Sequence, residues 1–143
     1  MTAMSYGRPG FANRFLSDGL ATASPATLLV MLYDRLVQDL QRAEQAQTGG
    51  DRQTAHTNLL HAQDIVVELQ SSLKVDLWEG GKNLASLYTW LLNELAQANI
   101  TGDAGRTKAA RSLVVEPLAD AWRQAAVEHL GATSVGAGAS GLA

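Results

Sequence analysis

The side chains that could do chemistry in this sequence are few and poorly grouped. The chain has three histidines, His56, His61 and His129, and no cysteine. Without cysteine there are no disulfides, thiolate metal sites or thiol nucleophiles. His56 and His61 are five residues apart, a spacing that turns two helical side chains away from a common metal ion. The Glu-x-x-His pattern of di-iron bundles is missing from the sequence. We therefore predict surface or groove-edge positions for the histidines, and no metal site.

Other chemical patterns are equally weak. Asp64 and Glu68 lie one helical turn apart, which predicts a solvated face rather than an acid–base pair. No P-loop and no Gly-x-Ser-x-Gly motif occurs. Arg106, Lys108 and Arg111 form a small basic cluster, but no aromatic residues are interleaved with it. The formal net charge of −3 also argues against nucleic-acid binding. The sequence therefore predicts neither an enzyme nor a cofactor nor a nucleic-acid partner.

Four long helical segments account for most of the chain. Ser24 is placed as the N-cap of the first segment, and Pro25 follows in its first turn, where the missing N–H does no harm. This segment runs to about Ala46 and ends before Thr-Gly-Gly. Asp51 and Asp103 are the expected N-caps of the second and fourth segments. The third segment lies between two glycine-containing turns.

Apolar residues recur at helical spacing in every segment, and in the second segment they follow the 3-4-3-4 pattern that is typical of a bundle seam. Sustained alternation of apolar and polar residues, the signal of a strand, does not occur. We predict an all-α protein, an antiparallel four-helix up-down bundle with a short N-terminal capping helix or segment around residues 11–20. The predicted core residues are Leu29, Leu32, Tyr33, Leu36 and Leu40, then Leu59, Ala62, Val66, Leu69 and Leu73, then Leu84, Leu87, Tyr88, Leu91 and Leu95, and finally Val114, Leu118, Ala121, Trp122 and Ala125.

Composition divides the chain into three parts. Residues 1–23 are predicted to be a flexible N-terminal segment that contains the cap, residues 24–130 the helical bundle, and residues 131–143 a disordered Gly/Ala/Ser tail. The N-terminus has no apolar core of secretory length, so no signal peptide is predicted. The longest apolar run, Leu28 to Tyr33, is far shorter than the roughly 20 residues of a spanning helix, so no membrane insertion is expected.

Pro117 conflicts with its surroundings, because it lies inside the fourth helical segment. Proline cannot donate a hydrogen bond to the carbonyl four residues earlier, and its ring crowds that carbonyl. We therefore predict a kink or break near residues 113–117.

Several apolar residues lie outside the predicted core faces. Either the helices bury unusually wide faces, or the surplus residues line grooves that the N-terminal segment or an apolar partner segment covers. The recurrence of such residues on three of the four segments favours grooves. The surplus residues are Val30, Met31 and Val37 in the first segment, Leu60 and Val67 in the second, with Gln63 on the same stripe, and Trp90 and Leu92 in the third.

Four stretches, in order, resemble the FliS family, the export chaperones of flagellin. The first is "TASPATLLVMLYDRL", which is similar to the family's Thr-Ala-Ser-Pro and Leu-Met-Leu-Tyr-Asp-Gly helix opening. The second is "LLHAQDIVVELQSSL", which resembles an Ala-Gln-x-Ile-x-x-Glu-Leu helix. The third, "GGKNLASLYTWLLNELAQANITGD", resembles a Leu-Tyr-x-Tyr helix, and the last is "LADAWRQA". The resemblance covers about residues 11–126.

This resemblance implies a cytoplasmic, non-enzymatic chaperone without a cofactor. Such a chaperone binds the disordered C-terminal segment of flagellin, which folds into short helices that wrap round it. Binding prevents premature polymerisation and aids delivery to the flagellar type III export apparatus. The family's N-terminal segment can occupy part of the binding surface. Three alternatives remain open: an adaptor or regulator that binds other flagellar proteins through the same grooves, a ligand- or metal-binding bundle enzyme, against which the missing Glu-x-x-His argues, and a self-associating structural bundle.

Eight residues are predicted to bind the partner. The resemblance places Phe15 and Leu20 on the removable cap, and the surplus residues add the groove-lining set Val30, Val37, Leu60, Gln63, Val67 and Trp90. Three departures from the family pattern stand out: Phe15 replaces the usual Tyr, Arg35 stands where Gly is frequent, and Pro117 interrupts the last helix.

Overall fold

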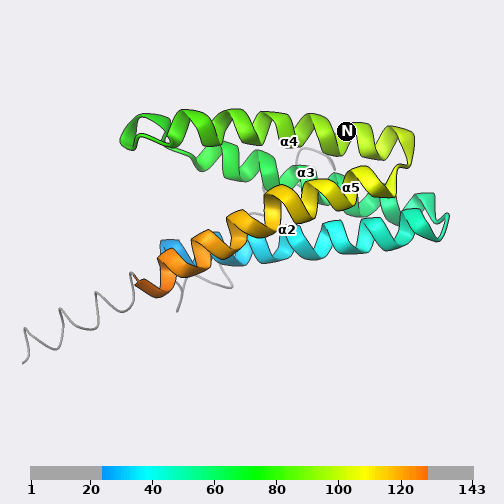
Figure 1. Cartoon of the computed structure of the whole chain (residues 1–143), viewed down its shortest axis with the longest axis horizontal. Helices are drawn as coiled ribbons and strands as arrows, with labels where there is room; N and C mark the ends of the chain where they lie inside the picture. The colour runs from blue at the N-terminus through cyan, green and yellow to red at the C-terminus, as the bar shows by residue number, and fades with distance from the viewer. Residues whose placement is uncertain (1–23, 129–143) are drawn as a thin grey trace, which may run out of the picture. The chain divides into compact units, whose positions relative to one another are not determined.

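The computed structural model describes residues 24–128, which are helical apart from short turns (Figure 1). The described residues form no strand, and the predicted all-α class is confirmed. The elements are α2 (Pro25–Thr48), α3 (Arg52–Ser72), the 3₁₀ turn η1 (Val75–Leu77), α4 (Gly81–Thr101), α5 (Ala104–Ala110) and the π-helix η2 (Arg111–Val115), after which residues 116–128 are again α-helical. The predicted cap with Phe15 and Leu20, the tail at 131–143 and His129 lie outside the described residues.

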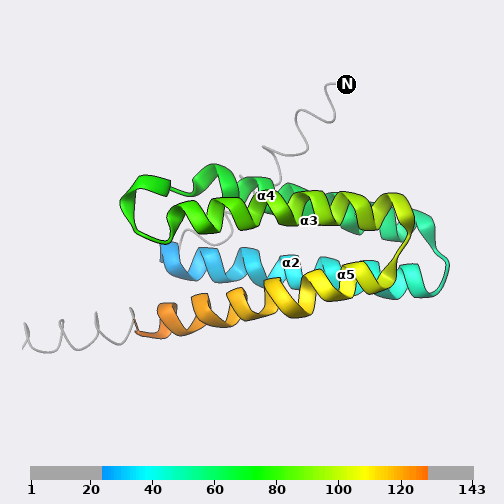
Figure 2. The ribbon, with the colours of Figure 1, turned by 45° about the horizontal axis from the view of Figure 1, so that its top comes forward.

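The chain divides into two compact units. The central unit is Arg35–Glu116, and the terminal unit contains the start of α2 and the last helix, residues 117–128. In the central unit α3 and α4 lie side by side (Figures 1 and 2). They are antiparallel, because an early residue of α3, His56, bonds to Asn99 near the end of α4, and Gln70 near the end of α3 bonds to Thr89.

A second antiparallel pair joins α2 to the fourth helical segment within the central unit. Thr107 Oγ1 donates to Gln47 Oε1 over 2.7 Å, and Arg111 Nη2 lies 2.9 Å from Glu44 Oε2. In the terminal unit Arg123 pairs with Asp34 and, at 3.0 Å, with Asp120. The up-down order of the whole bundle stays a prediction.

Side-chain caps start three of the helices where the sequence predicted them. Ser24 Oγ accepts from Thr27 N over 3.2 Å, Asp51 Oδ1 from Thr54 N over 3.1 Å, and Asp103 Oδ1 from Arg106 N over 3.2 Å. Each bond satisfies an N–H group that the first helical turn leaves without a partner. The three N-cap predictions are confirmed.

Most of the predicted core is confirmed for α2, α3 and α4. Leu29, Leu32, Leu73 and Leu87 are half-buried rather than buried. The structure adds Ile65 and Ala55 of α3 to the core. The buried members of the predicted set are Tyr33, Leu36 and Leu40, then Leu59, Ala62, Val66 and Leu69, then Leu84, Tyr88, Leu91 and Leu95.

The disturbance predicted near Pro117 takes the form of a π-helix. The helix does not break: Arg111–Val115 forms η2, in which the N–H of Glu116 bonds to the carbonyl of Arg111, five residues back. A π-turn widens the helix by one residue, which gives the proline ring room where an α-turn would press it onto a carbonyl. The prediction of a kink or break therefore identified the disturbed region, but the helix continues through it as a π-helix rather than breaking, and a kink stays a prediction.

This extra residue makes the predicted core face of the fourth segment wrong. Thr107 and Ala110 are buried before the π-helix, and the next buried residue, Val115, comes five positions later rather than four. The remaining predicted positions fail as well, since Ala121 is exposed and Trp122 only half-buried. The buried residues come one position later than predicted: Val115 instead of Val114, Ala119 instead of Leu118, and Ala126 instead of Ala125.

Candidate partner-binding surfaces

The predicted binding residues of α3 lie on one stripe of the helix, which borders α4 at Gln63 and the hollow between α2 and α3 at Leu60. His56 and Gln70 both bond to α4, and Gln63 lies seven residues from each, which puts it on the same side of the helix. Leu60 and Val67 flank Gln63 on this stripe. The Leu60 side chain is 45% exposed, and the other two are half-buried. The structure therefore brings Leu60, Gln63 and Val67 together on one accessible edge.

Trp90 does not join that edge. Its side chain is 44% exposed, and it lies one turn before Glu94, which pairs with Arg106 of α5 over 2.9 Å. Residues four apart share a helix face, so Trp90 lies on the edge of α4 that faces α5 rather than α3.

Val37 belongs to a third edge. It is half-buried and lies seven residues before Glu44, whose carboxylate is bound by Arg111 of the fourth segment. Val30 is half-buried on the part of α2 that belongs to the terminal unit. The predicted groove residues of the central unit are thus distributed over three helix edges, and their role in binding stays a prediction.

A hollow of about 370 Å³ lies between α2 and α3. Its most buried member is Asp39, whose side chain is 1% exposed. One oxygen, Oδ1, accepts from Arg35 Nε over 3.2 Å, and the other bonds to His61 Nδ1. The lining residues are Arg35, Asp39, Thr57, Asn58, Leu60, His61 and Asp64.

The prediction of surface or groove-edge histidines agrees with His61, which lines this hollow, but it does not include Asp39. The available signal was position: Asp39 lies three residues after Leu36 and four before Ala43, both of which are fully buried. A carboxylate on a buried stripe must find donors, because a charge taken out of water without partners is costly. The donors are Arg35 on the same helix and His61 on α3, which lies 22 residues further along the chain.

A second polar cluster surrounds Arg111, whose side chain is 15% exposed. Its guanidinium bonds to both oxygens of Glu44, over 3.1 and 2.9 Å, and to Glu116 over 3.1 Å. Burial alone would lower the pKa of Arg111, but the hydrogen bonds and charges of Glu44 and Glu116 outweigh it and raise that pKa above its ordinary value. This cluster ties α2 to the π-helix.

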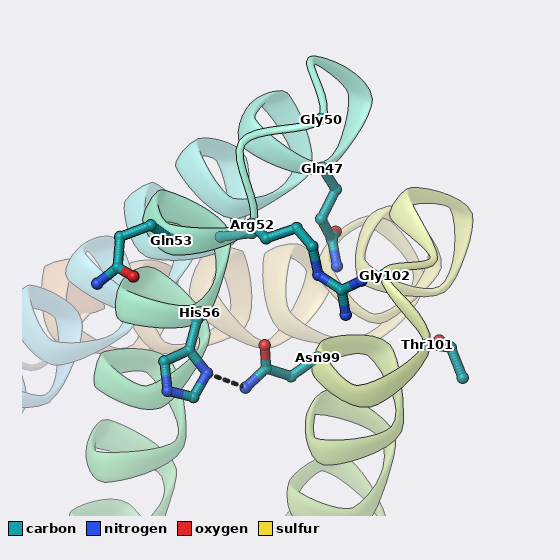
Figure 3. A pocket seen from close by; sticks show the side chains of 9 residues that line it. Gln47, Gly50, Arg52, Gln53, His56, Asn99, Thr101 and Gly102 are labelled. Atoms are coloured by element: carbon teal, nitrogen blue, oxygen red, sulfur yellow. Dashed lines mark hydrogen bonds between the residues drawn. The ribbon is translucent and has the colours of Figure 1, made fainter.

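A pocket of about 490 Å³ opens at the end of the central unit where the α2–α3 and α4–α5 turns meet (Figure 3). Its side chains are mostly polar. Gln47 donates to Ala98 O over 3.0 Å and accepts from Thr107, while His56 and Asn99 bond over 2.9 Å. These contacts join helices to one another, which indicates a structural role for Gln47 in particular.

Two consecutive apolar residues in the turn between α3 and α4 are exposed to solvent. Leu77 is 74% and Trp78 47% exposed, beside a hollow of about 470 Å³. Gly81 is required at this turn, since a Cβ there would lie 2.4 Å from the carbonyl oxygen of Val75. The sequence pattern predicts only a glycine-containing turn here.

Neither a metal-binding cluster nor a membrane-spanning helix occurs in residues 24–128. No group of three or more histidine, aspartate or glutamate side chains is placed there to hold a metal ion. Within the same residues no helix combines the length and the apolar character needed to cross a bilayer.

Comparison with known proteins decides the family. The model of the family described as "Flagellar protein FliS" matches residues 11–129. The chain belongs to the FliS family. Among its relatives is the flagellar secretion chaperone FliS of Bacillus subtilis strain 168, which is 31% identical over 111 residues, 78% of this chain and 82% of the relative. The FliS proteins of Escherichia coli K12 and Salmonella typhimurium LT2, named in the same way, are 28% and 30% identical over 123 residues, 82% of this chain and 88% of each relative.

Proposed function

We propose that this protein is a flagellar export chaperone that binds the disordered C-terminal segment of flagellin in the cytoplasm. It would keep flagellin from polymerising prematurely and aid its delivery to the flagellar type III export apparatus. The observation that carries the proposal is the FliS family match over residues 11–129, together with relatives named flagellar secretion chaperones.

The exposed apolar residues of the central unit support a binding role. Leu60 is 45% exposed on the edge of α3 and Trp90 44% exposed on the far edge of α4. One compact ligand would not cover both edges, whereas an extended segment that folds into short helices can follow them round the unit. Helix-in-groove recognition uses apolar anchors spaced along such a segment.

The mechanism is mass action rather than catalysis. A disordered segment loses conformational entropy when it orders on a surface, and buried apolar area must exceed that cost. While it is bound, the segment's apolar residues are hidden from other flagellin molecules. The polar clusters of the described residues fit this role, because they link helices to one another.

Calorimetry with a flagellin C-terminal peptide tests the proposal directly. We expect micromolar or tighter binding with a negative heat-capacity change, the signature of apolar burial. A scrambled peptide of the same composition serves as the ligand control. Leu60→Ser and Trp90→Ser should weaken binding without unfolding the protein, whereas Thr101→Ala, an exposed residue at the end of α4, should not. A folded protein that fails to bind the peptide at micromolar concentration would sink the proposal.

A further inference from the structure

Arg35 is the one cation among the lining residues of the α2–α3 hollow that is charged at every physiological pH. Its side chain is 41% exposed, and its one hydrogen bond within the described residues runs from Nε to Asp39. The two terminal nitrogens of the guanidinium make no hydrogen bond to residues 24–128. They carry four N–H donors, which a ligand entering the hollow can reach.

Asp39 holds this arginine in place rather than competing for a ligand. Both of its carboxylate oxygens are occupied, one by Arg35 and the other by His61. Because the Asp39 side chain is 1% exposed, it has little room to change partners. A guanidinium fixed through Nε offers its terminal nitrogens as a planar pair, the geometry that suits an oxygen acceptor.

The other lining residues of the hollow restrict the kinds of ligand group that can bind there. Leu60 at its rim is 45% exposed and offers an apolar contact. The amide of Asn58 and the hydroxyl of Thr57 already donate to carbonyls of their own helix. Asp64 also lines the hollow, so a ligand carboxylate would meet some repulsion there that a neutral carbonyl would not.

We propose that Arg35 strengthens client binding by donating to an oxygen acceptor of the docked flagellin segment, while Leu60 contacts an apolar side chain about one turn away along it. The acceptor is either an Asp or Glu carboxylate or a carbonyl at the end of one of the segment's short helices, where the last carbonyls lack partners. This inference rests on the proposed function, since it names a contact within the same binding event.

The test measures binding of the flagellin C-terminal peptide to five purified full-length proteins, the wild type, three single variants and one double variant, by calorimetry. Arg35→Ala should weaken binding roughly tenfold, as expected for the loss of a charge-assisted hydrogen bond. Arg42→Ala is the matched control, because Arg42 is an exposed arginine on the same helix that does not line the hollow, and its loss should leave the affinity unchanged. Leu60→Ala should weaken binding too, and Arg35→Ala should cost less in the Leu60→Ala protein than in the wild type because both contacts belong to one site.

Peptide variants distinguish the two kinds of acceptor. In each, one Asp or Glu is replaced by its amide. If one variant abolishes the difference between wild type and Arg35→Ala, the acceptor is that carboxylate; if every variant keeps the difference, the acceptor is a carbonyl. Circular dichroism confirms that each protein is folded. If wild type binds but Arg35→Ala and Arg42→Ala bind equally well, the inference is overturned and the proposed function stands. If folded wild type does not bind, both fall.

Discussion

Two arginine–carboxylate clusters in the central unit have opposite arrangements. In the Arg111 cluster the arginine is the inner group, 15% exposed, and the carboxylates of Glu44 and Glu116 surround it at 19% and 37% exposure. In the Asp39 cluster the carboxylate is the inner group, 1% exposed, and Arg35 and His61 lie outside it at 41% and 26%. The buried group is thus the arginine in the first cluster and the carboxylate in the second.

Which of the two groups is buried decides which hydrogen-bonding groups remain available to a partner. A buried guanidinium needs several acceptors, and Glu44 and Glu116 together occupy both of its terminal nitrogens. A buried carboxylate needs donors, and Asp39 uses one nitrogen of Arg35 while leaving the terminal pair. We conclude that the first cluster serves stability and that the second has donors to offer a ligand. The predictions below test that division.

The largest expected effect is the contrast between two single-residue deletions, one in the π-turn that brings Glu116 to Arg111 and one in α4. The π-helix contains one residue more than an α-helix would need, so deleting Leu113, which is 74% exposed, should leave Arg111 and Glu116 on one face. Pro117 must become alanine in the same protein, because its ring would clash in a regular α-helix. We expect this double variant to unfold cooperatively, with a midpoint within several degrees of the Pro117→Ala protein.

Deletion of Asn93 in the Pro117→Ala background is the control. Asn93 is also exposed, but α4 has no extra residue, so its loss rotates Leu95 and Ala98 out of the core by about 100°. This variant should lose cooperative unfolding in thermal denaturation followed by circular dichroism. Equal damage from both deletions would show that the π-turn is not a one-residue insertion in an otherwise continuous packing pattern.

Arg111→Ala should give the next largest effect. It leaves the half-buried carboxylates of Glu44 and Glu116 near one another without their cation, and we expect a loss of about 2 kcal/mol in the free energy of unfolding. Urea denaturation measures it. Arg106→Ala is the comparison, because its pair with Glu94 is more exposed, at 38% and 25%, and should cost roughly 0.5 kcal/mol. Similar losses for both variants would contradict the stabilising role of the Arg111 cluster.

Arg35→Ala should cost less stability than Arg111→Ala. The arginine is 41% exposed and pairs with Asp39 one turn along its own helix, and His61 still contacts the buried carboxylate after the substitution. We expect a loss below about 1 kcal/mol in urea denaturation. A loss as large as that of Arg111→Ala would mean that the Asp39 cluster is a structural tie like the other and would remove the basis of the comparison.

The sequence predicted those parts of the fold that depend on local patterns. Ser24, Asp51 and Asp103 could be placed as N-caps because a cap bonds to an N–H only three residues away. Leu91 and Leu95 could be placed in the core because α4 keeps a regular helical period. The register from Val115 onwards could not be predicted, since a proline indicates a disturbance but not whether the helix will break, kink or gain a residue.

The candidate site was predictable only in part, because it depends on which helix edges meet. Leu60, Gln63 and Val67 share a stripe by their spacing alone, and the structure keeps them together. Trp90 has the same chemical character, but only the Glu94–Arg106 pair shows that it faces α5. The partners of Asp39 were beyond periodicity altogether, because His61 reaches it from another helix.

A fourth carboxylate, which belongs to neither cluster, gives the smallest expected effect. Asp51 is fully exposed, and the pKa of its carboxyl is lowered from 3.8 by hydrogen bonds from the side chain and the backbone N–H of Thr54. A group with a lowered folded-state pKa stabilises the fold fully above its ordinary pKa and loses that contribution as the pH falls through the folded value. Asn is also a good N-cap but does not titrate there. The urea midpoint of wild type relative to Asp51→Asn should therefore be constant above about pH 5 and fall below about pH 3.5, since all other titrating groups are common to both proteins. A difference in urea midpoint that does not change with pH would show that the charge of Asp51 adds no stability to its cap.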